Sequence, residues 1–448
     1  MLNDTRASQI YTVYAPNNGA WLDITSRVKD RRRLDNIVKH HIINKVICGM
    51  TITGSDKSVG PTLFGKYLKL NILTDVVGNL KSDCGLKANF IKKDLMSENG
   101  VVHIIDKTIV PIEVMEKEQA LECLGTGDMH GLSEGARMMY NCKIDTGHGK
   151  RIYLLPTNKA LSWLNENQGP FRYHEKYTES FKYRCRVMRG HILKADDDLE
   201  RNDLVQKKAY ETELAKTKVI TTFVKERAGS KIYFNYAESA TRMPISFEGG
   251  VIYPINQIIF PPDGDLEETL ASFKDSRITS ESFQDSKVVY GIEKIMSTEY
   301  HKDWRKLHEI KDEEEYEREV FRVTPGLIFL SAYDRGWSTR KTESNYTQNE
   351  MRNFLLLHTL QGINLGGSIE NIMRGSLIEV STMLRKKDGS FQKLIIKRET
   401  SGNTFIGYEG LPRSDWSMVL DWLNPVTEGY IWKIDWPITC IDICDLKK

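Results

Sequence analysis

Apolar and polar positions follow the same order three times along this chain. Each time, a short apolar and β-branched run leads into a turn and a helix start, at residues 11–21, 152–161 and 327–337. A histidine among aliphatic residues follows (His41, His191, His358), and a glycine then opens a second apolar run (Gly100, Gly250, Gly429). The histidine and glycine are 59, 59 and 71 residues apart. Solenoid repeats are about 20–50 residues long, so the pattern predicts three whole domains.

The domains are predicted at residues 1–111, 112–262 and 263–448. A length of 448 residues agrees, since about 150 residues per domain is usual. Helical spacing of apolar residues precedes the first strand in copies two and three, at residues 120–142 and 288–307. Copy one has only ten residues in that place. We therefore expect domain one to be N-terminally incomplete and the least stable, and domain three to be the most divergent.

The strand-to-helix turn has a local explanation. Pro16 and Pro156 end strand pairing because proline lacks a backbone N–H. Asn18, Asn158 and Asp334 follow, and their side-chain oxygens are predicted to cap the next helix. These positions are predicted to be structural.

The three histidines are also predicted to be structural, as buried imidazoles that bond backbone groups. A catalytic histidine needs a nucleophile or carboxylate beside it, and no Ser, Cys or Asp recurs at a fixed spacing. The seven cysteines have no metal-ligand spacing, so no metal site or cofactor is expected. Their number is odd, and the sequence leaves their pairing open.

Charge and hydropathy restrict the partners. The formal net charge is +2, so no overall field favours nucleic acid. No apolar run is long enough to span a membrane, and residues 1–30 do not resemble a signal peptide. The basic run 27–33 is predicted to be a solvated surface, with glycosaminoglycan or anionic-lipid binding as the alternative. Asn345 and Asn3 stand in possible N-glycosylation triplets.

The motifs resemble those of fasciclin-type domains. Residues 11–21 are similar to the family's first motif, His40-His41 to its Tyr-His element, and residues 99–106 to its closing Asn-Gly-Val-Ile-His-Val-Ile-Asp string. The resemblance covers about 430 residues and is weakest in copy three. It implies an α+β fold of three tandem domains, each a twisted β-sandwich wedge with small packed helices. It also implies structural roles for the closing residues Asp106, Asn256 and Asp435.

The resemblance further implies a non-enzymatic adhesion or interaction glycoprotein of the cell surface or an endomembrane lumen such as a vacuole. Its partners would be proteins or glycans. Integrin binding is not expected, because His40, Gly190 and Leu357 replace the family's tyrosine and no Arg-Gly-Asp occurs. These departures fit a fungal or other non-animal member as well as an animal one. The alternatives are a carbohydrate-binding or lumenal sorting module using Trp304, Trp416 or Trp422, and a hydrolase whose pocket the sequence does not reveal.

Overall fold

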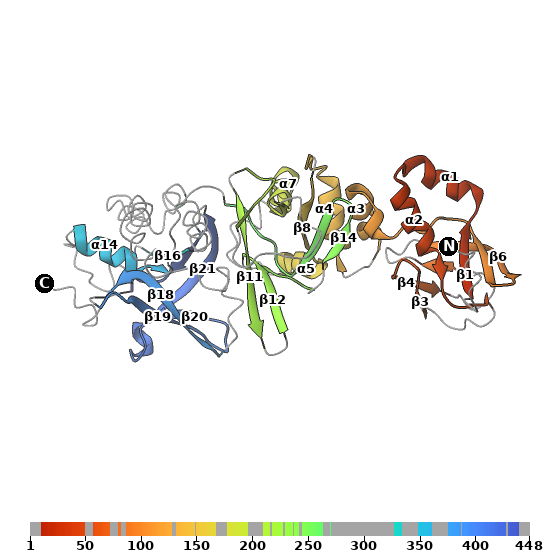
Figure 1. The fold of residues 1–448 in the computed structure, drawn as a ribbon. Coiled ribbons are helices and arrows are strands. Elements are labelled where there is room, and N and C mark those ends of the chain that lie inside the picture. The colour runs from red at the N-terminus through yellow and green to blue at the C-terminus, as the bar shows by residue number, and fades with distance from the viewer. Residues whose placement is uncertain are drawn as a thin grey trace. The chain divides into compact units, whose positions relative to one another are not determined.

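The structure is a computed structural model, and Figure 1 shows its helices and strands. It divides into two compact units. The first comprises Met1–Leu161 with Met243–Pro254, and the second Ser162–Arg242 with Ile255–Lys448. The described residues are 10–49, 57–71, 79–81, 87–127, 131–147, 149–166, 177–195, 209–215, 217–226, 229–235, 237–241, 244–262, 269, 327–333, 348–360, 375–386, 388–426 and 429–438.

A seven-stranded sheet forms the framework of the first unit. Its strands, in spatial order, are β2 (Ile42–Ile43), β1 (Tyr11–Pro16), β7 (Gly100–Ile105), β6 (Lys87–Ser97), β5 (Asn79–Lys81), β4 (Tyr67–Asn71) and β3 (Lys57–Pro61). β1 and β7 run parallel, from Tyr11 beside Gly100 to Pro16 beside Ile105. All other neighbours are antiparallel. The first and last strands predicted from the sequence are therefore direct neighbours.

β1 forms because its sequence fits a half-buried strand. Thr12 and Tyr14 alternate with more exposed residues, and both are fully buried. Tyr14 stacks on His103 of β7 with ring centroids 5.4 Å apart, and Phe90 of β6 packs edge-on against the same histidine. Ile43, Leu80 and Ile105 lie in the same core cluster. The β1 and β7 patterns thus place one aromatic group at the centre of this core.

Helix α1 (Asn18–Arg27) begins one residue away from where the sequence prediction placed its cap. Asn17, not Asn18, is the N-cap, and its Oδ1 accepts from the N–H of Ala20 at 2.8 Å. At the corresponding turn before α5 (Asn158–Glu166), Thr157 Oγ1 accepts from the N–H of Ala160. The cap prediction for Asn18 and Asn158 is therefore wrong. The residue directly after the proline keeps the extended backbone that an N-cap needs, and the next residue is already helical.

Replacing Asn17 by alanine should lower the free energy of unfolding of the first unit by about 1 kcal/mol, because the Ala20 N–H loses its acceptor. Asn18→Ala is the matched control and should change stability by less than about 0.5 kcal/mol, since this side chain is exposed. Urea unfolding of both variants would measure the difference. Equal losses at the two positions would contradict the capping assignment.

Asn158 has a different role in the structure. Its Oδ1 accepts from the N–H of Glu134 at 3.0 Å, at the start of α4 (Ser133–Asn141), and its Nδ2 bonds Ser133 Oγ. The predicted helical stretch 120–142 is two helices, α3 (Lys117–Thr126) and α4. The stretch predicted at 288–307 lies outside the described residues. The unit also contains α2 (Arg31–His40), η2 (Ile112–Val114), β8 (Arg151–Pro156), β14 (Ile245–Phe247) and β15 (Gly250–Ile255).

The second unit contains a four-stranded sheet and a closed barrel. The sheet is antiparallel, in the order β10 (Ala209–Glu211), β11 (Lys218–Glu226), β12 (Gly229–Phe234) and β13 (Ala237–Glu238). The barrel strands are β16 (Leu327–Ala332), β17 (Thr359–Leu360), β18 (Leu377–Arg385), β19 (Phe391–Arg398), β20 (Thr404–Gly407), β21 (Ser417–Val426) and β22 (Gly429–Ile434). α7 (Phe181–Gly190), β9 (Ile192–Lys194), α14 (Gln348–Leu357) and η5 (Arg413–Asp415) complete the named elements.

The barrel and the seven-stranded sheet have the same order of strands. β16 is paired in parallel with β22 and antiparallel with β17, as β1 is with β7 and β2. In the barrel, β17 also pairs with β18, which closes the ring. In the first unit the corresponding closure is a single bridge between Ile43 and Thr62. The fold is α+β. In the second unit, the strands that were expected to form a wedge form a closed barrel, because β17 pairs with both β16 and β18.

Candidate interaction surface

The three histidines predicted from the sequence make the same contacts. Nδ1 of each bonds the carbonyl oxygen four residues earlier, on Ile37, Val187 and Phe354, at 2.7, 2.8 and 2.8 Å. Nε2 of each accepts from a backbone N–H far ahead in the chain, of Ile109, Ile259 and Ile438, at 3.0 Å in all three cases. Each imidazole therefore ties the end of a helix to the segment after the closing strand.

These contacts require a neutral ring with its proton on Nδ1, because Nε2 must accept. His41 is 3% exposed, His191 0% and His358 1%. Burial lowers the pKa of each to about 4, opposed in part by the bond from Nδ1 to the carbonyl. Both ring nitrogens are occupied by backbone groups, so this arrangement does not present a general base to a substrate.

The closing glycines allow two strands to approach closely. Gly100 and Gly250 have φ values of +152° and +140°. A Cβ on either would lie 1.9 Å from a backbone oxygen, that of Tyr11 or Arg151. Gly429 has the same kind of backbone, with φ +157°. These positions determine the register of the closing strand and are not exposed for binding.

The closing polar residues join the end of that strand to its neighbour. Asp106 accepts from the N–H and side-chain amide of Asn89, at 2.6 and 2.8 Å. Asp435 accepts from the N–H groups of Met418 and Trp436, at 2.8 and 2.9 Å. At Asn256 the described bond is from its backbone N–H to the carbonyl of Glu238. Asp334, Asn345, Asn3 and Trp304 lie outside the described residues.

The site residues predicted from the sequence therefore belong to the scaffold. Pro16 and Pro156 are the last residues of β1 and β8, and each histidine lies at the end of a helix. They do not converge on a shared surface. Trp416, named for a carbohydrate-binding alternative, is 8% exposed, and its Nε1 donates to the carbonyl of Leu411.

A groove of about 480 Å³ in the first unit was not predicted. Its sides are α1 and α3, and segment 106–110 and Met115 complete its lining. Apolar lining comes from Ala20, Ile24, Val28, Val110 and Met115, and charged lining from Asp23, Arg27, Asp106, Lys107 and Glu122. Three separate segments contribute, so no local spacing in the sequence could have revealed it. We define these residues as the α1–α3 groove.

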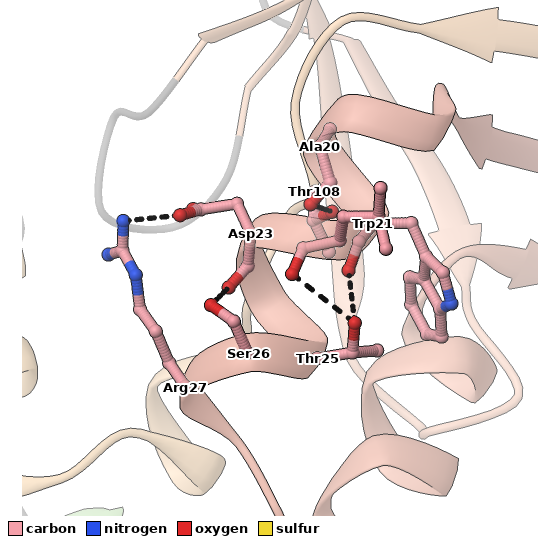
Figure 2. A network of polar contacts seen from close by, with 8 residues as sticks. Ala20, Trp21, Asp23, Thr25, Ser26, Arg27 and Thr108 are labelled. Carbon is pink, nitrogen blue, oxygen red and sulfur yellow. Dashed lines mark hydrogen bonds and ion pairs between the residues drawn. The ribbon is translucent and has the colours of Figure 1, made fainter.

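Figure 2 shows the polar contacts of α1, which lines this groove. Thr108 Oγ1 donates to the carbonyl of Ala20 at 3.0 Å, which joins segment 106–110 to the helix. Thr25 and Ser26 donate to carbonyls within α1, and Arg27 pairs with Asp23 at 2.6 Å. α1 has no buried residue. Trp21 and Ile24 are partly buried and pack against the core cluster of Val28, Ile37 and Val114, while Leu22, Asp23, Ser26 and Arg27 are exposed.

The described residues also limit the chemistry. Among them, no group of three or more His, Cys, Asp or Glu side chains is placed to hold a metal ion. Within the same residues, no helix is long and apolar enough to cross a membrane. Cys123, Cys142 and Cys185 are disulfide-bonded. Disulfides persist in oxidising compartments, which is information that the spacing of the cysteines did not give.

Comparison with known proteins shows which proteins parts of this chain resemble. Residues 1–111 match the Fasciclin domain family. Fasciclin-1 of Schistocerca americana is 24% identical over 204 residues, 44% of this chain and 30% of that protein. Human periostin is 28% identical over 122 residues, 25% of this chain and 14% of that protein. Mouse stabilin-2 is 21% identical over 279 residues, 59% of this chain and 10% of that protein.

Residues 1–111 are thus similar to the fasciclin type, as the motifs indicated. A solved FAS1 domain pair from the insect cell adhesion molecule fasciclin I aligns with a TM-score of 0.36 and 20% identity, over 58% of this chain and 91% of that chain. The sequence matches make up less than a third of the length of each of the three relatives above.

Proposed function

We propose that this chain is a non-enzymatic adhesion or interaction protein built from three successive fasciclin-type domains, at residues 1–111, 112–262 and 263–448. The observation that carries the proposal is the Fasciclin family match over residues 1–111. Proteins named fasciclin-1, periostin and stabilin share this similarity. The sequence resemblance associates such domains with adhesion or matrix contact and not with catalysis.

Repeated geometry supports three domains. The histidine bridge occurs once in each proposed domain, with 68, 68 and 80 residues between the ring and the N–H that it accepts. The parallel pairing of first and closing strands occurs in domains one and three. In domain two, Arg151 N donates to the carbonyl of Gly249, as Tyr11 N does to that of Asn99. The histidine bridge and the pairing of first and closing strands both join residues tens of positions apart. Three unrelated segments would not be expected to share them.

The disulfide-bonded cysteines support a place in the secretory route, at a cell surface or in an endomembrane lumen such as a vacuole. Glycosylation at Asn345 or Asn3 belongs to the same proposal. The partners would be proteins or glycans. A carbohydrate-binding or sorting module is the second candidate, and the burial of Trp416 reduces its support.

An adhesion assay tests the proposal. Beads coated with the full chain should bind one another or bind cells. Reversing two exposed charges of the α1–α3 groove, with Lys107→Glu and Glu122→Arg, should reduce this binding at least about fivefold, because rim charges control encounter and register.

The control is a pair of opposite reversals outside the groove, Lys386→Glu with Glu409→Arg, which leaves the net charge equally unchanged and should have no effect. Coated beads that bind neither one another nor cells would contradict adhesion. If such a protein bound a specific carbohydrate on a glycan array, the carbohydrate-binding candidate would be favoured.

A further inference from the structure

The turn between α1 and α2 has an unusual concentration of positive charge. Residues 23–39 contain six basic and three acidic side chains, a formal net charge of +3, whereas the whole chain has +2. Arg27, Lys29, Arg31 and Arg32 are all exposed. We define these four residues as the basic turn. Their Cα atoms span at most about 19 Å along the chain, so the charges are close together.

The placement of two of these charges is unfavourable for the helix itself. Arg31, Arg32 and Arg33 form the first turn of α2, which has no acidic residue. The N-terminus of a helix is the positive end of its dipole, so cations there destabilise it. Asp30 compensates in part, since its Oδ1 accepts from the N–H of Arg32 at 2.8 Å. Folding alone therefore does not explain arginine at positions 31 and 32.

Arg33 is different because it has a structural role. Its Nε and Nη2 donate to the carbonyl of Val114, at 3.0 and 2.7 Å, and its Nη1 pairs with Glu116 at 3.1 Å. Its side chain is only 13% exposed. Arg33 is thus directed inward and anchors α2, while Arg31 and Arg32 are exposed to solvent.

The backbone of the basic turn is attached to the core of the first unit. Val28 lies between its basic residues, is 4% exposed and packs in a core cluster with Ile37 and Val114. The N–H of Val28 bonds the carbonyl of Ile24 at 2.8 Å. The exposed cations therefore need little ordering of the backbone when they bind a ligand.

We infer that the basic turn is a binding site for a sulfated polysaccharide. Arginine and lysine bind sulfate oxygens through charge-assisted hydrogen bonds, and a flexible polyanion can contact several exposed cations at once. The disulfide-bonded cysteines favour this ligand over an anionic membrane, because phosphatidylserine is concentrated on the cytoplasmic leaflet, where disulfides are rare. The basic turn shares Arg27 with the α1–α3 groove. Its test is nevertheless independent of the adhesion proposal, because direct binding does not require that the chain joins cells.

Affinity for immobilised heparin tests the inference. The full chain should bind heparin, and binding should weaken as salt rises. Arg31→Glu with Arg32→Glu should weaken it at least tenfold. The same substitutions place acids at the N-terminus of α2, so the melting temperature should stay the same or rise. A loss of binding therefore could not be attributed to unfolding.

Lys92→Glu with Lys386→Glu is the matched control, with the same change in net charge at exposed lysines outside the basic turn. It should retain at least half of the affinity of the parent. The inference is overturned if the parent does not bind heparin, if both double variants lose affinity equally, or if the parent binds phosphatidylserine vesicles and not heparin. The bead assay can fail while heparin binding succeeds, and the reverse, so the two proposals are judged separately.

Discussion

Gly100→Ala should destabilise the first unit by at least about 4 kcal/mol and remove the parallel pairing of β1 with β7. A Cβ at this position would lie 1.9 Å from the carbonyl oxygen of Tyr11, inside the van der Waals radii of both atoms. The backbone φ of +152° adds strain for any residue with a side chain. The contact involves backbone on both sides, so no rotamer change can relieve it. Hydrogen exchange of residues 11–16 and 100–105 should become fast.

Gly65→Ala is the matched control in the same unit. Gly65 also has a positive φ, +87°, but nothing lies within 4 Å of the position that a Cβ would take there. The expected loss is about 1–2 kcal/mol, from backbone strain alone. Gly250→Ala should repeat the large effect at strand β15, since its Cβ would lie 1.9 Å from the carbonyl oxygen of Arg151. If Gly100→Ala and Gly65→Ala cost the same, the close-approach argument is wrong.

The chain should lose stability steeply between about pH 6.5 and pH 4, in a window set by the three bridging histidines. Their pKa is 6.5 when unfolded and about 4 when folded, so the unfolded chain takes up protons that the folded chain excludes. Stability is therefore complete above pH 6.5 and falls as the pH is lowered. At about 1.4 kcal/mol per pKa unit, each histidine contributes about 2 kcal/mol of loss by pH 5 and about 3 kcal/mol by pH 4.

Urea midpoints measured from pH 7.5 to 5 are the appropriate test, because carboxylates with ordinary pKa values titrate mostly below this range. His191→Gln should lower the midpoint at pH 7.5 and reduce the dependence on pH, since one titrating bridge is gone. His40 is a further buried histidine, with its pKa lowered to about 3 by burial and by the neighbouring His41 and Lys66. The first unit then has two buried histidines, His40 and His41, as the second has in His191 and His358, so we expect both units to lose stability in acid. A midpoint that does not change with pH would refute the neutral-bridge description.

The fold was predictable where the sequence pattern is local. Tyr11–Tyr14 and residues 100–105 have the composition of strands, and both are strands that lie side by side. The histidines were expected in buried positions bonded to backbone, and the structure places them there. The division into three domains stays a prediction. It rests on spacing and on the repeated bridges.

The cap at α1 shows why a local sequence pattern does not determine which of two adjacent residues caps a helix. Asn17 and Asn18 are the same residue type, and the choice between them depends on where the backbone leaves the extended conformation after Pro16. At the second turn the choice was between Thr157 and Asn158, and packing against α4 gave Asn158 a different partner. Neither outcome is encoded in the propensity of a single residue.

The sequence by itself determined the strands, the glycine and histidine positions and the similarity of residues 1–111 to fasciclin domains, because these depend on residue chemistry at fixed spacing. Only the tertiary structure decided the closure of the barrel, the α1–α3 groove and the disulfide state of Cys123, Cys142 and Cys185. It also separated Arg33, which is turned inward, from Arg31 and Arg32, which are exposed. The physical reason is that these features join segments tens of residues apart, and a local pattern contains no information on which distant segments come together.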